Sequence, residues 1–369
     1  MAPDETAPAS SLTRARGPLA GGLVALALVA GAFLVAGARK PAPLQAVAPS
    51  ATAAPLVPGS FVERLDVGTF RKGNLHTHSN WSDGDHDPAD VYTWYREHGY
   101  AFLAMTDHNH RTDPALFKHL ERPGTFVIIP GEEITMYVEA LPVHVNALCH
   151  GKTIGGGHFP SVAAALGFGI GETLAQGGIA LVNHPNFEWA LTAKDVVEAK
   201  GARLLEIWSG HPYTRPAGDA THPSAEVIWD ETLGVGLDYV GVGVDDSHHL
   251  RAAIGDDDKA APGRVWVQVF SAQLDAKTLC ADIQRGRLYT STGPSLRHLT
   301  VGDATMTLEV EAGASLVEFV GAGGSVLSSL RPGAGEPASY KLAGGETYVR
   351  ARVTGADGKR AWTQAYRVR

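Results

Sequence analysis

The chain has 369 residues, of which 44% are hydrophobic and 19% are charged, and its formal net charge is −8. This length fits one barrel-sized domain with an accessory module, and the composition excludes a mainly disordered protein. The negative charge argues against a protein that binds many phosphates of a nucleic-acid backbone. Nucleotides and oligonucleotide ends remain open as substrates, because bound divalent ions would add positive charge locally.

An uncharged apolar stretch at residues 19–38 follows a polar N-terminal segment. About twenty such residues can span a bilayer as a helix, and Ala36-Gly37-Ala38 is also typical of a signal-peptide cleavage site. We therefore expect residues 1–38 to be a signal peptide or a signal-anchor, followed by a Pro/Ala-rich linker at residues 39–60. Both interpretations predict an exported protein, which is periplasmic, extracellular or attached to the inner membrane through the uncleaved segment.

Strand-like apolar runs alternate with helical segments over residues 61–295. Polar residues follow five of these runs, namely the one before His76 and those at 99–105, 125–129, 179–183 and 240–244. Further strands are expected at residues 134–139, 143–148 and 204–208. One helix is expected to begin at Pro88, a second to end near Gln176 and a third to begin at the capping box of Thr192 and Asp195. Two more are expected over residues 224–232 and 275–284. This alternation predicts an α/β fold with a parallel sheet, whose chemistry lies at the carboxyl ends of the strands.

After Pro294 the pattern changes to alternating strands with Gly-rich turns, at residues 305–310, 315–320, 348–353 and 362–368. No helical period is visible there, so residues 296–369 are expected to form a small all-β, sandwich-like accessory domain. It holds none of the clusters of metal-ligand residues. Packing against the barrel and binding a partner both remain open as its role.

Nine residues of types that ligate metals stand in short clusters behind the expected strands. They are His76, His78, Asp83, His108, Glu133, His144, His184, Asp246 and His248. Six imidazoles and three carboxylates are too many for one tetrahedral ion, which takes about four ligands. The set instead suits two or three ions that share a carboxylate and a hydroxide, which is hydrolytic machinery.

The ordered motifs resemble those of the PHP superfamily, named for polymerase and histidinol phosphatase, over about residues 70–295. They are His76-Thr77-His78-Ser79, Ser82-Asp83-Gly84, Thr106-Asp107-His108-Asn109, Gly131-Glu132-Glu133, His144, Asn183-His184-Pro185 and Asp246-Ser247-His248. The details look most like the stand-alone branch that includes carbaryl hydrolase. The resemblance implies a distorted (β/α)7 barrel that holds two or three divalent ions, either Zn²⁺, Mn²⁺ or Fe²⁺.

The resemblance also implies how the ligands divide among the ions. His76, His78, Glu133 and Asp246 would hold the first ion. Glu133 would bridge to a second, completed by His144 and His184, while Asp83, His108 and His248 would hold the third. Asp246, Glu133 and His248 would then act catalytically through a metal-bound hydroxide.

Three functions remain open from the sequence. The first is a phosphoesterase for small phosphate esters such as nucleotides. It could act as a nucleoside bisphosphate phosphatase or, like a 5′–3′ exonuclease, on oligonucleotide ends. The second is a hydrolase of carbamates, carboxylic esters or amides, and the third is a non-enzymatic metal-dependent scaffold. A basic rim around the site would favour the first, whereas an apolar pocket with Trp189 and Trp208 would favour the second.

Several other polar residues are weaker candidates. His211, Arg215 and Arg251 lie in loops after expected strands and could bind an anionic part of a small-molecule substrate, although exposed charge is the commoner explanation for such residues. Asp107 either orients a ligand or is a turn residue, and a metal-bound water or His110 could be the general acid. Cys149 and Cys280 are interpreted as small apolar residues rather than as a disulfide pair.

Overall fold

The structure is a computed structural model that describes residues 59–253, 255–311 and 314–369. The predicted signal segment at 1–38 and nearly all of the predicted linker lie outside the described residues. Within those ranges no helix combines the length and the apolar character that crossing a membrane requires. The predictions of export and of membrane attachment therefore stay predictions.

Six strands form the first sheet, which mixes parallel and antiparallel pairs. In sheet order they are β10 (Val240–Val244), β9 (Leu204–Ser209), β8 (Ile179–Val182), β6 (Leu141–Leu148), β5 (Gly131–Val138) and β7 (Gly157–His158). The pairs β10–β9, β9–β8 and β5–β7 are parallel, but β8–β6 and β6–β5 are antiparallel. The prediction of a parallel sheet is thus only partly right, because Glu139, at a φ of 56°, turns β5 directly into β6 without a crossover helix.

A second sheet extends from residues 61–295, the predicted hydrolase-like region, into the C-terminal strands. Its order is β16 (Val326–Leu330), β15 (Ala314–Val320), β18 (Tyr348–Gly355), β19 (Arg360–Thr363), β12 (Leu288–Ser291), β11 (Trp266–Val269), β2 (Arg71–Asn74), β3 (Phe102–Ala104) and β4 (Val127–Ile129), with β20 (Tyr366–Arg367) beside β18. β2, β3 and β4 are parallel. Isolated bridges from Thr77 to Ser247 and from His108 to Glu133 connect the two sheets. Thr77, Ser247 and His108 lie beyond the carboxyl ends of their strands, whereas Glu133 lies near the start of β5.

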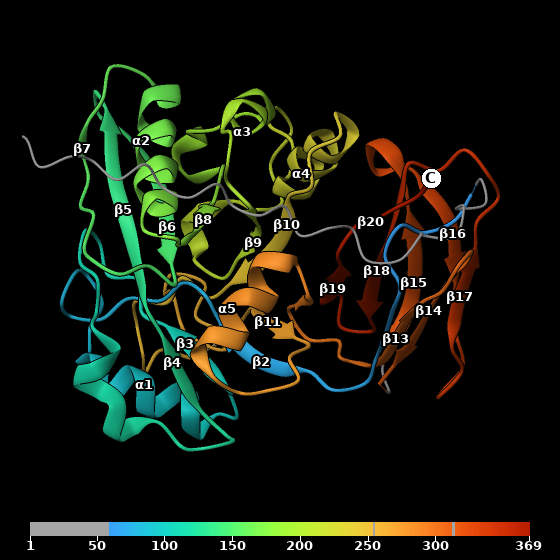
Figure 1. Ribbon diagram of the computed structural model, residues 1–369, viewed down its shortest axis with the longest axis horizontal. Coiled ribbons are helices and arrows are strands. Elements are labelled where there is room, and N and C mark those ends of the chain that lie inside the picture. The colour runs from blue at the N-terminus through green and yellow to red at the C-terminus, as the bar shows by residue number, and fades with distance from the viewer. Residues whose placement is uncertain (1–58, 254, 312–313) are drawn as a thin grey trace, which may run out of the picture. The chain divides into compact units, whose positions relative to one another are not determined.

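Helices cover these sheets largely where the sequence predicts them. They are α1 (Pro88–Glu97), α2 (Val162–Ala175), α3 (Ala193–Glu198), α4 (Ala225–Gly234) and α5 (Ala276–Arg285), with 3₁₀ turns at Pro114–Leu120, Phe187–Trp189, Pro212–Thr214 and Ala322–Gly324. α2 packs on β6 and β8, and α4 packs on β9 (Figure 1). The predicted capping box is present, because the side chains of Thr192 and Asp195 each accept a hydrogen bond from the other's backbone N–H.

Cys149 and Cys280 form a disulfide, which corrects the interpretation of both as small apolar residues. Their Cα atoms are 6.1 Å apart, although the residues are 131 positions apart in the sequence. That separation is why spacing alone gave no sign of the pair. The bond ties α5 to the end of β6, the strand that carries His144.

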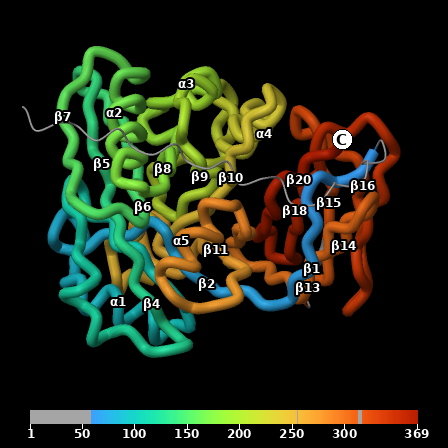
Figure 2. The backbone as a smooth tube through the Cα atoms, in the orientation of Figure 1, coloured from blue at the N-terminus to red at the C-terminus, as the bar shows by residue number. Residues whose placement is uncertain are grey.

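The C-terminal residues form two facing sheets with an apolar core between them, and the N-terminal part of the described chain joins them. β1 (Leu65–Val67), β13 (Leu296–Val301), β14 (Thr305–Val310) and β17 (Ala338–Lys341) form one sheet, and β15, β16 and β18 belong to the other. Their inner side chains, including Leu299, Met306 and Phe319, pack together. Figure 2 shows β1, in blue, beside these strands, so the segment 61–67, assigned by sequence to the hydrolase domain, pairs with the accessory strands.

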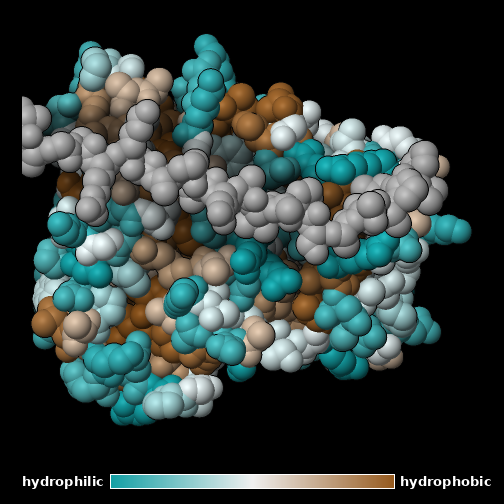
Figure 3. All heavy atoms as spheres, in the orientation of Figure 1, coloured by the Kyte–Doolittle hydropathy of each residue, from teal (hydrophilic) through white to brown (hydrophobic). Residues whose placement is uncertain are grey.

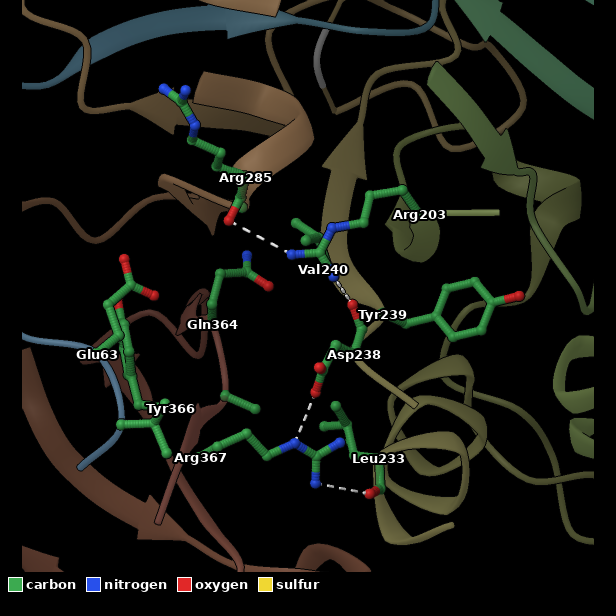
Figure 4. A pocket seen from close by; sticks show the side chains of 13 residues that line it. Glu63, Arg203, Leu233, Asp238, Tyr239, Val240, Arg285, Gln364, Tyr366 and Arg367 are labelled. Atoms are coloured by element: carbon green, nitrogen blue, oxygen red, sulfur yellow. Dashed lines mark hydrogen bonds and ion pairs between the residues drawn. The ribbon is translucent and has the colours of Figure 1, made fainter. Parts of the chain in front are cut away.

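Polar contacts join the accessory strands to the hydrolase-like region. Figure 4 shows Arg367 reaching the side chain of Asp238 and the backbone of Leu233, with Nε 2.6 Å from Asp238 Oδ1. Gln364 exchanges two hydrogen bonds with the backbone of Gly241 on β10. On the face seen in Figure 3, apolar and polar side chains are interspersed.

Candidate metal centre

Four donor atoms from three chain segments converge where the two sheets meet. His76 and His78 follow β2, Glu133 lies on β5 and Asp246 follows β10. The Nε2 atoms of both histidines lie 3.2 Å from Glu133 Oε2, 3.3 Å from Asp246 Oδ1 and 3.1 Å from each other. All four side chains are buried. This first donor group is the one that the resemblance implies for the first ion.

The second oxygen of Glu133 belongs to a different group. Glu133 Oε1 lies 2.9 Å from His144 Nδ1 and 3.3 Å from His184 Nε2, and these two nitrogens are 3.4 Å apart. Asn183 donates a hydrogen bond of 2.7 Å to the same oxygen and so fixes the orientation of the carboxylate. One buried carboxylate therefore presents its two oxygens to two sets of imidazoles.

A third group surrounds Asp83 at the open side of the cluster. Asp83 Oδ1 lies 3.2 Å from His248 Nε2 and 3.4 Å from His78 Nδ1, while Oδ2 lies 3.4 Å from His108 Nε2. The side chain of Asp83 is 53% exposed, whereas that of Glu133 is 1% exposed. Solvent reaches this group, and His78 and His108 each also direct their other ring nitrogen towards Glu133.

The electrostatics of the cluster suit bound cations. Burial would raise the pKa of Glu133, but the imidazoles of His144, His76 and His108 hold it well below its usual range. Burial would lower the pKa of His108, but Glu133 and Asp83 raise it to about 9. Among the described residues, no Lys or Arg forms an ion pair with Glu133 or Asp246. Imidazole nitrogens and carboxylate oxygens are donors that Zn²⁺, Mn²⁺ and Fe²⁺ accept, so the residues fit such ions.

The backbone at Asp246 is held in an uncommon conformation. Its φ is 50°, in the left-handed region that residues other than glycine seldom adopt. The Asp246 N–H donates to the carbonyl of His76 at 2.9 Å, which holds the end of β10 beside the end of β2. Strain of this kind persists where surrounding contacts enforce it, as they do at this candidate ligand.

Glu206 is a buried part of the cluster that the sequence interpretation missed. Its Oε1 lies 2.6 Å from His76 Nδ1, and its Oε2 accepts a 2.8 Å hydrogen bond from the backbone N–H of His184. A proton on His76 Nδ1 directed at Glu206 leaves Nε2 free to face the first donor group. The only sign in the sequence is one carboxylate inside the apolar strand β9.

Replacing Glu206 with Gln should weaken metal binding by about 10–100-fold, because an amide orients both His76 and the His184 backbone less strongly. Metal affinity measured by titration of the metal-free protein tests this directly. Glu172→Gln on the exposed face of α2 is the matched control and should keep the parental affinity. Equal affinities for the two variants would show that Glu206 does not position His76.

The neighbouring carboxylates serve the surrounding loops. Asp107 accepts hydrogen bonds from the backbone and hydroxyl of Ser79 and from the Ser82 hydroxyl, at 2.7–2.8 Å, and so braces the loop before Asp83 rather than a candidate ligand ring. Asp245 is fully buried and accepts from Asn74, from Tyr95 and from the backbone of residues 263–265. It therefore supports the end of β10 and does not face solvent.

The three substrate-binding candidates lie in different surroundings. The ring of His211 is 5.1 Å from that of His248, and burial lowers the pKa of His211 to about 4. Arg215 is exposed, with its guanidinium 5.3 Å from the Trp189 ring. Arg251 is also exposed. The structure thus places His211 beside the cluster and brings all nine candidate ligands together. Each of the nine belongs to a group of His, Asp and Glu side chains whose donor atoms lie close enough to hold a metal ion.

No protein-family model matches the sequence, and no curated protein matches it. Solved structures similar to the chain include a two-domain protein from Bacteroides vulgatus that contains a predicted PHP-like metal-dependent phosphoesterase, at 14% identity and a TM-score of 0.43, covering 86% of this chain and 99% of that one. Another is an amidohydrolase from Chromobacterium violaceum with bound sulfate and no metal, at 14% identity and a TM-score of 0.38, covering 58% and 96%.

A third solved structure is a candidate metal-dependent phosphoesterase from Bifidobacterium adolescentis, at 14% identity and a TM-score of 0.36, covering 50% of this chain and 91% of that one. The first description names a PHP-like metal-dependent phosphoesterase and the third a metal-dependent phosphoesterase, and none of the three names carbaryl hydrolase.

Proposed function

We propose that the chain is a metal-dependent hydrolase of the PHP type, and that it acts as a phosphoesterase on small phosphate esters such as nucleotides. The observation that carries this proposal is Glu133, whose two oxygens face two separate sets of imidazoles. A carboxylate that served a single ion would need imidazoles beside only one of its oxygens. The arrangement is the one that a pair of adjacent ions sharing one carboxylate requires.

The strand order supports the distorted (β/α)7 barrel that the resemblance implies. β2, β3, the bent β4–β5 segment, β6, β8, β9 and β10 follow one another in seven positions. The bridges between Thr77 and Ser247 and between His108 and Glu133 lie where the two sheets would have to meet to close such a ring. Candidate ligands would then stand at the carboxyl ends of the barrel strands.

In this proposal His76, His78, Glu133 and Asp246 hold the first ion, and Glu133, His144 and His184 hold the second. Asp83, His108 and His248 hold a third. When bound, the ions would supply an activated water as nucleophile and neutralise negative charge on the substrate. Glu206 and Asn183 orient the ligands, and the exposure of Asp83 favours the third group as the side on which substrate enters.

Phosphate esters are favoured over carbamates because several cations side by side can each take one phosphate oxygen. The alternative, a carbamate, carboxylic ester or amide hydrolase, needs only one cation to polarise its carbonyl. Trp189, one of the aromatic residues that would favour it, stacks instead on His222, with the ring centres 3.9 Å apart. The disulfide between Cys149 and Cys280 supports export, since such bonds persist in oxidising compartments.

The test is a comparison of hydrolysis rates for an aryl phosphate and an aryl carbamate by the purified protein loaded with Mn²⁺ or Zn²⁺. We expect release from the phosphate that a chelator abolishes and that added metal restores. Release mainly from the carbamate would favour the alternative function, a hydrolase of carbamates, carboxylic esters or amides. The absence of any chelator-sensitive hydrolysis in a protein that binds metal would favour the non-enzymatic scaffold.

A further inference from the structure

Two 3₁₀ turns lie in contact with each other beyond the carboxyl ends of neighbouring parallel strands. The turn Phe187–Trp189 follows β8, and the turn Pro212–Thr214 follows β9. The side-chain amide of Asn186 donates a 3.0 Å hydrogen bond to the carbonyl of Arg215, which ties the start of one turn to the end of the other. Both turns therefore stand on the side of the sheet where the candidate ligand His184 also follows β8.

The ring of Phe187 packs directly against two candidate ligands. Its centre lies 5.2 Å from that of the His184 ring and 6.1 Å from that of the His144 ring. The backbone of this turn is fixed, because the N–H of Phe187 donates to the carbonyl of His184 at 2.9 Å and the N–H of Ala190 donates to that of Phe187 at 3.0 Å. Phe187 is only half-buried, so it remains partly open to solvent beside these two imidazoles.

Tyr213 on the second turn lies near a third candidate ligand. Its ring centre is 5.5 Å from that of His211, and the His211 ring is 5.1 Å from that of His248. The N–H of Tyr213 donates to His211 Nδ1 at 3.3 Å, and the Thr214 hydroxyl donates to the His211 carbonyl at 2.7 Å. Tyr213 is nevertheless 53% exposed. An exposed tyrosine on a fixed backbone offers a large contact area and loses little conformational freedom when a ligand binds.

The backbone of the two turns is held in an uncommon conformation. Glu188 and Trp189 have φ values of 49° and 54°, and Arg215, directly after the second turn, has a φ of 47°. The Trp189 ring stacks on that of His222, with the ring centres 3.9 Å apart, and the guanidinium of Arg215 lies 5.3 Å from the same ring. Residues other than glycine adopt this left-handed conformation at a cost in stability, and such strain gathers at ligand-binding sites. The strain therefore supports a functional role for the pair of turns.

We propose that Phe187 and Tyr213 recognise the leaving group of the substrate, and that this group carries a planar aromatic ring. The inference rests on the proposed phosphoesterase function, because the phosphate would lie at the donor groups that these two side chains adjoin. A planar ring can stack on the ring of Phe or Tyr, whereas a short alkyl group gives much less contact. Two kinds of phosphate ester carry such a ring, namely aryl phosphates and nucleotides.

The experiment is calorimetric titration of the metal-loaded protein with phenylphosphonate and methylphosphonate. The two probes resist hydrolysis, share the anionic group and differ in the ring. We expect phenylphosphonate to bind about 10-fold more tightly than methylphosphonate, and Tyr213→Ala to remove most of this preference. Tyr213→Phe keeps the ring and should keep the preference. Phe187→Leu should also lower it, at a metal content that mass spectrometry shows to be unchanged.

Tyr137→Ala is the matched control. Tyr137 is 38% exposed, but its ring stacks on that of His158 on β7 rather than on a residue of the cluster. This variant should keep the parental preference for phenylphosphonate.

Turnover by the metal-loaded protein then distinguishes the two kinds of ester. Phenyl phosphate is compared with methyl phosphate, and AMP is compared with ribose 5-phosphate. If Tyr213→Ala lowers kcat/KM selectively for phenyl phosphate, the surface recognises a ring joined directly to the phosphate. If the selective loss is for AMP, it recognises a nucleobase.

Two failures of the titration have different meanings. Equal affinity of the parent protein for the two phosphonates, or a parental preference in both Tyr213→Ala and Phe187→Leu, would overturn the recognition of a ring and leave the phosphoesterase proposal standing. Failure of the metal-loaded parent protein to bind either phosphonate would overturn both.

Discussion

Replacing Glu133 with Gln should lower kcat/KM by at least ~10³-fold, because the metal-dependent part of catalysis is worth several kcal/mol. Glu133 Oε2 lies 3.2 Å from both His76 Nε2 and His78 Nε2, and Oε1 lies 2.9 Å from His144 Nδ1. An amide keeps the shape of the side chain but places an NH₂ group where one of these oxygens would be a ligand. It also removes a negative charge that would stabilise bound cations.

Metal content after dialysis, measured by mass spectrometry, is the readout that separates ligand loss from other causes of inactivity. Glu132→Gln is the matched control, since Glu132 is equally buried but accepts hydrogen bonds from the backbone of Ile154 and Gly155 on another side of the strand. We expect it to lower thermal stability and to retain metal. Normal metal content and turnover in Glu133→Gln would remove Glu133 from the centre and with it the two-ion proposal.

Most of the candidate ligand positions were predictable because they follow strand-like runs, and parallel strands bring such positions to one edge. Glu133 and His144 differ, since they lie within β5 and β6, which are antiparallel. The division of His78 and His108 between the donor groups at Glu133 and Asp83 was not predictable. The direction of a ring nitrogen depends on the rotation of the side chain, which sequence spacing leaves open. Glu206 has no neighbouring motif and is recognisable only by its 2.6 Å contact with His76. Local patterns thus find ligands more readily than the residues that orient them.

Long-range pairings account for the remaining differences in the fold. The disulfide joins Cys149 to Cys280 across 131 positions, and β1 pairs with β13 although Leu65 and its partner Val301 are 236 positions apart in the chain. Neither pairing has a local signal, because both depend on how distant segments come together. The hairpin at Glu139 was locally visible as two β-like runs, but the expected strand-helix alternation favoured a parallel arrangement.

Replacing Arg350 with Met should lower the free energy of unfolding by about 3–5 kcal/mol, because it leaves buried carboxylates without their cation. The side chain of Arg350 on β18 is fully buried and donates to both oxygens of Asp230, at 2.9 and 2.7 Å, and to Glu226 at 2.8 Å. Both carboxylates belong to α4, which packs on β9. Chemical denaturation at neutral pH measures the loss.

The pH dependence gives this prediction a second readout. Burial would raise the pKa of Glu226, but Arg350 and Arg352 hold it below its ordinary value of 4.5. A carboxyl group with a lowered pKa stabilises the folded state above its unfolded pKa, and this contribution is lost as the pH falls through the folded pKa. The difference in stability between parent and Arg350→Met should therefore be largest near neutral pH and shrink below about pH 4.5.

Arg352→Met is the matched control on the same strand. Arg352 also reaches Glu226, at 3.0 Å, but its side chain is 23% exposed and shares Glu318 on β15, so its loss should cost only about 1 kcal/mol. Adding Asp230→Asn and Glu226→Gln to Arg350→Met should recover part of the lost stability, since no buried charge is then unpaired. An equal cost for the two arginine variants would mean that the β18–α4 contact is no stronger than a surface pair. In that case the accessory strands would have to be held to the hydrolase-like region mainly by the sheet that β12 and β19 share.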